Sequence, residues 1–206
     1  MPVHRAGLAD ARQRSGPGSE STWKNRRVRA PETLDIGRLL LRRPTAADAD
    51  AILSYGGDPE VTRWLEWPLH RSIDDSIAFV AWADAVWSSS SAGPYLVTDR
   101  GGQVLGSTGL NMENPLRAST GYVLARDAWG QGYATELAGA MTELAAVLGV
   151  VRLEALCHPD NRASARVLGK VGFVREGVLR RHTVFPNLGA DGPLDVEIWA
   201  WIRPGR

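Results

Sequence analysis

The sequence predicts a single α/β domain in which strand–helix–strand units are joined to hairpins. Two patterns predict this fold class. Short runs rich in β-branched and aromatic residues alternate with segments in which apolar residues recur at helical spacing. In the strongest helical segment, residues 133–148, the apolar positions lie three or four residues apart: Tyr133, Leu137, Met141, Leu144 and Leu148. No linker long enough to divide the periodic region interrupts it, so we expect residues 32–206 to form one domain.

The first half of this domain predicts one strand and two helices. The strand covers residues 38–43, and a helix begins at Pro44 and Thr45. An aromatic stretch over residues 61–68 precedes a second helix. Each helix opens with the spacing of a capping box, Thr45 with Asp48 and Ser72 with Asp75.

The second half predicts strands interrupted by two helices. A hairpin joins residues 95–98 to residues 103–106 through a glycine turn, and its second strand extends to Met112. Gly149 ends the long helix. The remaining elements are strands over residues 120–124, 151–156, 173–174 and 196–202, with a short helix over residues 161–170.

Residues 1–31 are expected to be a disordered, basic extension. They hold seven Lys or Arg residues against Asp10 and Glu20, a balance of +5, so the rest of the chain carries −4 of the net charge of +1. The segment is rich in Arg, Ser, Gly and Pro and has no apolar period. Because the body is acidic, nucleic acid is a disfavoured partner.

The single cysteine, Cys157, excludes an internal disulfide and a zinc site built on paired cysteines. We therefore expect a protein of the reducing cytoplasm. The sequence has no run of about eighteen apolar residues, so we expect neither a membrane span nor a secretory signal. The histidines lack metal-ligand spacing, and we expect no metal.

Residues 124–136 predict a strand, a glycine-containing turn and the start of the long helix, an arrangement that binds phosphate. The free N–H groups of a first helical turn favour an anion, and Gly130 and Gly132 let the backbone approach it. A P-loop is excluded because no Gly-Lys-Ser/Thr follows. A dinucleotide site is disfavoured because Thr135 takes the third glycine position and Glu154 lies inside its strand. A glycine pair that only shapes the backbone stays an alternative.

A second motif follows at residues 158–164, His-Pro-Asp-Asn-Arg-Ala-Ser, with Gly172 and Phe173 after it. With residues 129–136, Trp-Gly-Gln-Gly-Tyr-Ala-Thr-Glu, it resembles the GCN5-related N-acetyltransferase (GNAT) superfamily. Within it, the sequence is similar to the RimJ/RimL-type branch, which acetylates N-terminal alanine or serine of ribosomal proteins. The resemblance extends from about residue 34 to 202, and residues 61–68 match the acceptor-side loop. Trp129 departs from the superfamily pattern, which has Gln or Arg there.

The resemblance implies the GNAT fold, in which helices flank a central, mixed, mostly antiparallel and twisted sheet. It also implies acetyl-CoA as the co-substrate. Backbone N–H groups would bind the pyrophosphate at Gln131, Gly132, Ala134 and Thr135. A strand splayed from its neighbour would offer main-chain groups to pantetheine and the acetyl carbonyl at Tyr122, Val123 and Leu124. Asn161 would contact pantetheine, and Ser164 would lie near the sulfur.

Transfer of an acetyl group to an amine calls for a proton donor and a proton acceptor. Ser164 is the first candidate donor to the leaving thiolate, and Tyr122 is the second. Asn161 and Ser164 also have the spacing of a helix N-cap, and the two roles are compatible. Glu113 is the first candidate base because it follows a central strand; the alternatives are Glu66, His70 and His182. A water-mediated base, or an amine that arrives neutral, needs none of them.

Trp64, Glu66 and Trp67 are the candidate acceptor-binding residues, with Trp82 as a further aromatic candidate. The implied branch indicates a protein N-terminal α-amine as acceptor. A small amine such as an amino acid, amino sugar or antibiotic stays open because variable loops choose the acceptor. A non-catalytic acyl-CoA-binding regulatory module is the alternative of another class. The sequence leaves the oligomeric state open, a homodimer included.

Overall fold

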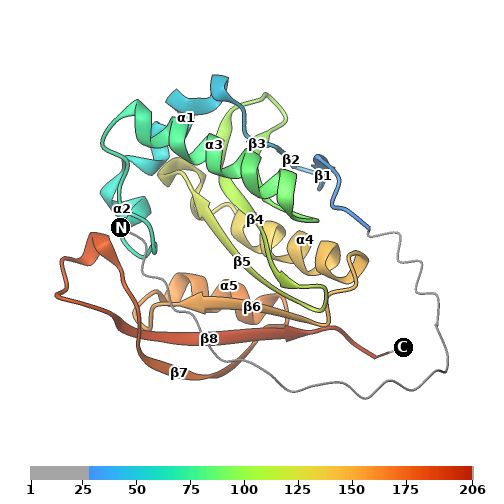
Figure 1. Cartoon of the computed structure of the whole chain (residues 1–206). Coiled ribbons are helices and arrows are strands. Elements are labelled where there is room, and N and C mark those ends of the chain that lie inside the picture. The colour runs from blue at the N-terminus through green and yellow to red at the C-terminus, as the bar shows by residue number, and fades with distance from the viewer. Residues whose placement is uncertain (1–27, 206) are drawn as a thin grey trace, which may run out of the picture.

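An eight-stranded sheet in the order β1-β2-β3-β4-β5-β6-β8-β7 carries helices on both faces in the computed structural model, which describes residues 28–205 (Figure 1). The strands are β1 Thr33–Asp35, β2 Leu39–Arg42, β3 Pro94–Asp99, β4 Val104–Asn114, β5 Arg117–Leu124, β6 Arg152–Cys157, β7 Val174–Thr183 and β8 Leu194–Ile202. The helices are α1 Ala49–Gly56, α2 Pro59–Thr62, α3 Ile73–Ser89, α4 Tyr133–Val147 and α5 Arg162–Lys170. Three short 3₁₀ turns complete them, η1 Ala46–Asp48, η2 Arg126–Ala128 and η3 Pro186–Leu188.

Neighbouring strands pair antiparallel throughout, except that β5 and β6 are parallel. This confirms the mixed, mostly antiparallel sheet that the sequence predicts. The parallel pairing covers three residue pairs and ends at Ser119 and Glu154. Beyond that point β5 continues to Leu124 along β4, while β6 continues to Cys157 along β8. The two strands therefore diverge toward their C-terminal ends and open the sheet in a V (Figure 1).

Two apolar clusters hold the helices to the two faces of the sheet. The larger contains Leu137, Met141 and Leu144 of α4, Leu168 of α5, and residues from most of the strands. The smaller contains Ile52, Tyr55 and Val80 of α1 and α3 with Leu96 and Val123 of the sheet. Helices α1 and α3 thus cover one face and α4 with α5 the other, because successive strand residues such as Leu96 and Val97 point to opposite faces.

Most predicted elements are present, and both predicted capping boxes form. The Thr45 box caps the 3₁₀ turn η1, which leads directly into α1, so the helix proper begins four residues later than expected. The Ser72 box caps α3. Strand β1 and helix α2 were not predicted, and of β7 only the first residue was.

Residues 28–31 belong to the predicted extension but contact the domain. Ala30 is buried, and its N–H donates to Ser91 O at 2.7 Å. The hydroxyl of Tyr95 donates to Pro31 O at 2.6 Å. The rest of the predicted extension, residues 1–27, lies outside the described residues. Between residues 28 and 205, no helix has the length and apolar character that a membrane crossing requires.

Candidate active site

The V between β5 and β6 opens into a cleft of about 680 Å³. Its floor consists of residues 107–111 of β4, residues 119–123 of β5 and the last three residues of β6. Asn161 and Ser164, at the start of α5, close one side, and α3 with residues 64–70 closes the other. His158, Asn161 and Ser164 of the second motif therefore line one cavity with Tyr122 and Val123 of β5, and the glycine turn at residues 129–136 lies beyond this lining.

The open edge of β5 presents peptide groups to this cleft. The N–H of Ala125 donates to Leu105 O, which turns the peptide groups of Ala125 toward β4. Because these groups alternate along a strand, those of Tyr122 and Leu124 point to the opposite edge, where pairing with β6 has ended. One of them is already engaged, since Leu124 O accepts from the indole Nε1 of Trp129 at 2.8 Å. The predicted splaying of this strand from its neighbour is present.

Strand β5 leads into the predicted phosphate-binding turn. Gly130 and Gly132 have φ angles of +75° and +85°, in the left-handed region that favours glycine, and Gly132 is the N-cap of α4. Among residues 28–205, no hydrogen bond engages the N–H of Gln131, Gly132 or Ala134. The N–H of Thr135 differs from the prediction because it donates to Gly132 O at 3.0 Å. Three of the four predicted N–H groups are thus free for an anion.

Side chains from distant segments hold this turn in place. Arg126 forms a two-pronged ion pair with Asp58, with N···O distances of 3.0 and 2.6 Å. Arg38 donates to Gln131 O at 2.8 Å and pairs with Glu136 in the first turn of α4. The indole of Trp129 binds the end of β5, as described above. Trp129, the departure from the superfamily pattern, therefore ties the turn to its strand.

A tyrosine and a serine from different elements meet on the floor of the cleft. The hydroxyl groups of Tyr122 on β5 and Ser164 on α5 are 2.9 Å apart. Burial raises the pKa of Tyr122 to about 12, so its phenol is protonated at neutral pH. Asn161 is the N-cap of α5, and its Oδ1 accepts from the N–H of Ser164 at 3.1 Å. The capping role expected from the spacing is present, and it orients the residue that carries the hydroxyl.

Cys157 ends β6 beside this hydroxyl pair. Its side chain is buried and lines the cleft, and burial raises the pKa of its thiol. The Sγ atom lies 3.4 Å from Asn161 O. The thiol is therefore protonated at neutral pH, and its contact with Asn161 O fixes its position, as expected of a small buried residue.

Aromatic rings dominate the opposite wall. Trp64 stacks on His158 with ring centroids 4.5 Å apart, and His158 meets Phe185 edge-on at 5.0 Å. Trp67 packs against His70 at 5.1 Å. Phe79 and Trp82 of α3, together with the exposed Glu66, complete the cleft-facing group. Trp64, Glu66, Trp67 and Trp82 thus lie together where the sequence analysis expects an acceptor.

Asn187 joins two segments that build this wall. Its Oδ1 accepts from the N–H of Leu69 at 2.9 Å. Its Nδ2 donates to Thr62 O at 2.7 Å and to Trp67 O at 3.0 Å. One side chain thereby fixes the connection between β7 and β8 against the loop between α2 and α3.

Comparison with known proteins assigns the family. The model of the acetyltransferase (GNAT) domain matches residues 38–174. This chain belongs to the GNAT acetyltransferases. The uncharacterized N-acetyltransferase p20 of Bacillus licheniformis is 31% identical over 154 residues, which cover 72% of this chain and 86% of p20. The family and its relatives are N-acetyltransferases, so the chain is an enzyme of that class, and the non-catalytic module is set aside.

Two solved structures illustrate the shared fold. RimL, described as a ribosomal L7/L12 α-N-protein acetyltransferase in complex with coenzyme A, matches with a TM-score of 0.73 and 23% identity over 83% of this chain and 98% of its own. The microcin C7 self-immunity acetyltransferase MccE, in complex with acetyl-CoA and AMP, matches with a TM-score of 0.74 and 19% identity over 85% of this chain and 99% of its own. RimL was solved with CoA and MccE with acetyl-CoA.

The candidate bases of the acetyltransferase fall into two groups. Glu113 and His182 do not line the cleft: Glu113 pairs with Arg117 at 3.6 Å, and His182 Nδ1 lies 3.0 Å from the hydroxyl of Thr183. Glu66 and His70 do line it. His70 Nδ1 lies 2.9 Å from the hydroxyl of Ser76, and burial lowers the pKa of its imidazole. The structure therefore leaves two of the four candidates in the cleft.

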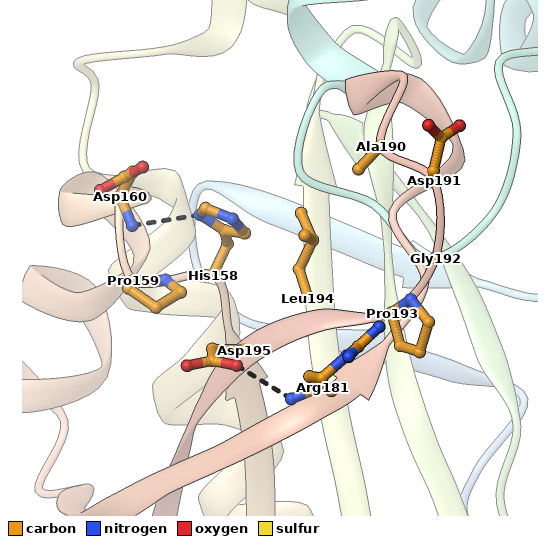
Figure 2. A pocket seen from close by; sticks show the side chains of 10 residues that line it. All are labelled: His158, Pro159, Asp160, Arg181, Ala190, Asp191, Gly192, Pro193, Leu194 and Asp195. Carbon is orange, nitrogen blue, oxygen red and sulfur yellow. Dashed lines mark hydrogen bonds between the residues drawn. The ribbon is translucent and has the colours of Figure 1, made fainter.

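A second cavity, of about 500 Å³, shares His158 with the cleft (Figure 2). His158 lines both cavities, and its Nδ1 accepts from the N–H of Asp160 at 3.1 Å. Asp160, Asp191 and Asp195 give the second cavity three carboxylates, and Arg181, whose backbone N–H donates to Asp195 Oδ1 at 2.9 Å, lines it as well. The sequence analysis assigned no role to His158, Asn187 or Arg38, because no local spacing links each to its distant partners.

Proposed function

We propose that this enzyme transfers the acetyl group of acetyl-CoA to the N-terminal α-amine of a protein. The observation that carries the proposal is the pair of cavities that share His158. A single small amine fills one cavity, whereas a polypeptide N-terminus inserted into the cleft extends past His158 into the second. The likeness to RimL, a protein described as an α-N-protein acetyltransferase, supports the same acceptor class.

The charges of the two cavities suit a cationic chain end. Glu66 and Asp75 line the cleft, and three aspartates line the second cavity with one arginine, Arg181, so carboxylates outnumber arginines in both. An α-ammonium group meets carboxylates and aromatic faces along this path, and both attract a cation. An α-amine has an unperturbed pKa near 8, so a modest proton acceptor is sufficient.

The chemical step assigns roles to the residues on the cleft floor. The free peptide groups of β5 hold pantetheine and the acetyl carbonyl, while the N–H groups of Gln131, Gly132 and Ala134 hold the pyrophosphate. The neutral amine attacks the thioester carbonyl, and the carbon–sulfur bond breaks. Ser164 and Tyr122 donate a proton or hydrogen bond to the leaving sulfur, and Asn161 positions Ser164. The amine proton passes to Glu66 or His70, directly or through water.

The test is release of free CoA from acetyl-CoA with peptides that have N-terminal Ala or Ser and contain no lysine. Each peptide is paired with the same sequence carrying a blocked N-terminus, and mass spectrometry locates the added acetyl group. Free amino acids, aminoglycosides and polyamines form parallel acceptor pools.

Turnover with free but not blocked peptides, with acetylation at residue 1, is the expected result. Turnover confined to one small-amine pool would show that the enzyme acetylates a metabolite or an antibiotic. This result contradicts the proposed acceptor. Equal turnover with the free and the blocked peptides contradicts it as well, because acetylation then does not need the N-terminal amine.

A further inference from the structure

We propose that Arg38 is a positioning residue for the pyrophosphate of acetyl-CoA, acting on the turn before α4 rather than on the cofactor. This inference rests on the proposed function, because it concerns the same cofactor site. Arg38 precedes β2, ninety-three residues before the turn that it contacts. Three contacts of its guanidinium group carry the inference.

The first contact fixes the orientation of one peptide group. Arg38 Nη2 donates to Gln131 O at 2.8 Å. In a planar trans peptide, the C=O of one residue and the N–H of the next point in opposite directions. Holding the Gln131 carbonyl therefore aims the N–H of Gly132 away from Arg38. Since Gly132 lies at φ +85° and lacks a side chain, this peptide would otherwise rotate at low cost.

The second contact neutralises a carboxylate at the anion site. Glu136 lies in the first turn of α4, and Arg38 Nε donates to its Oε1 at 3.0 Å. Its other oxygen, Oε2, is buried and has no hydrogen-bond partner among the described residues. Without Arg38, this carboxylate would repel an incoming pyrophosphate at the end of the helix that should attract it.

The third contact keeps the guanidinium group in place. Its Cζ lies 4.5 Å from the ring centroid of Tyr133, the first residue of α4. A cation over an aromatic face is attracted to it, so the ring and the carboxylate together restrict a side chain that is otherwise half exposed. All three contacts lie within residues 131–136, so Arg38 fixes the conformation of the turn and of the first turn of α4.

The test measures binding of three ligands to the full chain by tryptophan fluorescence. CoA contains the pyrophosphate and the 3′-phosphate, dephospho-CoA keeps only the pyrophosphate, and pantetheine has neither. We expect Arg38→Gln to weaken CoA and dephospho-CoA equally, by roughly tenfold, and to change pantetheine by less than about twofold. Arg38→Gln combined with Glu136→Gln should bind CoA more tightly than Arg38→Gln alone, because the unpaired carboxylate is gone.

Arg100→Gln is the matched control. Arg100 is another exposed arginine, which pairs with Asp35 at 2.9 Å and donates to Gly37 O at 2.6 Å, next to Arg38 in sequence. The Arg100→Gln substitution removes the same charge as Arg38→Gln but leaves the turn before α4 unchanged. CoA binding should therefore stay within about twofold of the unchanged protein.

Other outcomes overturn the inference in distinguishable ways. Weaker binding of CoA with unchanged dephospho-CoA would show a direct contact of Arg38 with the 3′-phosphate. Equal weakening of all three ligands would show a general loss of structure, and an equal effect of Arg100→Gln would show a non-specific charge effect. If the unchanged protein binds none of the three ligands, the proposed function itself fails.

Discussion

The segments proposed to bind the cofactor (residues 122–136, the cofactor wall) and the acceptor (residues 62–82 and 184–193, the acceptor wall) are built in opposite ways. The cofactor wall, residues 122–136, is one continuous strand, turn and helix start, to which single side chains such as Arg38 and Asp58 are attached. The acceptor wall consists of residues 62–82 and 184–193, which Asn187 and the Trp64–His158–Phe185 stack hold together. These segments are more than a hundred residues apart in the chain. A local wall is suited to a constant ligand, whereas a wall assembled from loops can change its ligand without disturbing the fold.

The largest expected effect comes from a substitution in β4 that would clash with the backbone of β5 in the cofactor wall. Gly106 of β4 lies at φ +150°, and a Cβ there would be 2.0 Å from Val123 O and 2.9 Å from Leu124 Cα. We expect Gly106→Ala to lower the free energy of unfolding by about 3 kcal/mol or more, because β4 and β5 must separate where Gly106 pairs with Leu124, just before the turn. Urea denaturation measures this change.

Gly121→Ala is the control for this backbone effect. Gly121 lies on the neighbouring strand, and a Cβ there would meet no heavy atom within 4 Å. We expect a change in the free energy of unfolding below about 1 kcal/mol. Equal stabilities of the two variants would show that the close approach at Gly106 is not a constraint.

The next effect separates chemistry from cofactor binding within the same wall. Tyr122→Phe and Ser164→Ala each remove one member of the hydroxyl pair. We expect each to lower kcat by about a hundredfold and to leave the KM for acetyl-CoA within about threefold, because proton donation matters only as the thiolate leaves. The double variant should be little slower than either single variant, since the two groups act as a unit.

Tyr95→Phe is the matched control for this pair. Tyr95 is also buried, and its hydroxyl donates to Pro31 O away from the cleft. The Tyr95→Phe variant should have a lower free energy of unfolding and an unchanged kcat. Losses of kcat that multiply in the Tyr122 and Ser164 double variant would show that the two hydroxyls act independently.

A smaller effect tests the acceptor wall. Asn187→Asp keeps the shape of the side chain but removes the donor to Thr62 O and Trp67 O, and it places a carboxylate against two carbonyls. We expect the KM for a peptide acceptor to rise about tenfold, with the KM for acetyl-CoA unchanged. Asn114→Asp is the control, because Asn114 uses only its Oδ1, which accepts from the N–H of Leu116. An equal rise in both KM values would show that Asn187 supports the whole domain.

The difference between the walls also explains which elements the sequence predicted. The helical period of α4, the two capping boxes and the β3–β4 hairpin are local signals, and all three appear in the structure. Strand β7 was mostly missed because it is an edge strand with two register shifts, and most of its side chains are exposed. It lacks the alternating buried face that makes a strand recognisable. Strand β1 and helix α2 have three and four residues, too few for a period.

The same distinction applies to the site. Gly132 and Ser164 lie in motifs and Tyr122 in the strand before the first motif, so the sequence offers them as candidates, whereas Asn187 has three backbone partners more than a hundred residues away. Glu113 was expected just after a strand, facing the cleft. Strand β4 instead continues to Asn114, so Glu113 stays inside the hairpin and pairs with Arg117 of β5. Strand ends depend on hairpin pairing, which a single segment does not specify.

Mild acid should loosen the acceptor wall first. Burial lowers the pKa of His70 and of His158, although Asp75 and Asp160 oppose the shift. Both imidazoles are neutral at pH 7 in the folded and the unfolded chain. As the pH falls below about 6.5, the unfolded chain takes up these protons more readily than the folded one, so the folded state loses stability.

The cofactor wall has no such group, since the pKa of the Asp58 carboxyl lies below its usual range beside Arg126 and that pair stays charged at pH 5. We expect the free energy of unfolding to fall between pH 7 and pH 5, and to fall less in His158→Gln. Hydrogen exchange should show faster opening at residues 62–70 and 184–193 than at residues 122–136 over this range. Equal acceleration in both walls would mean that acid weakens the domain as a whole and that the acceptor wall is not a separate unit.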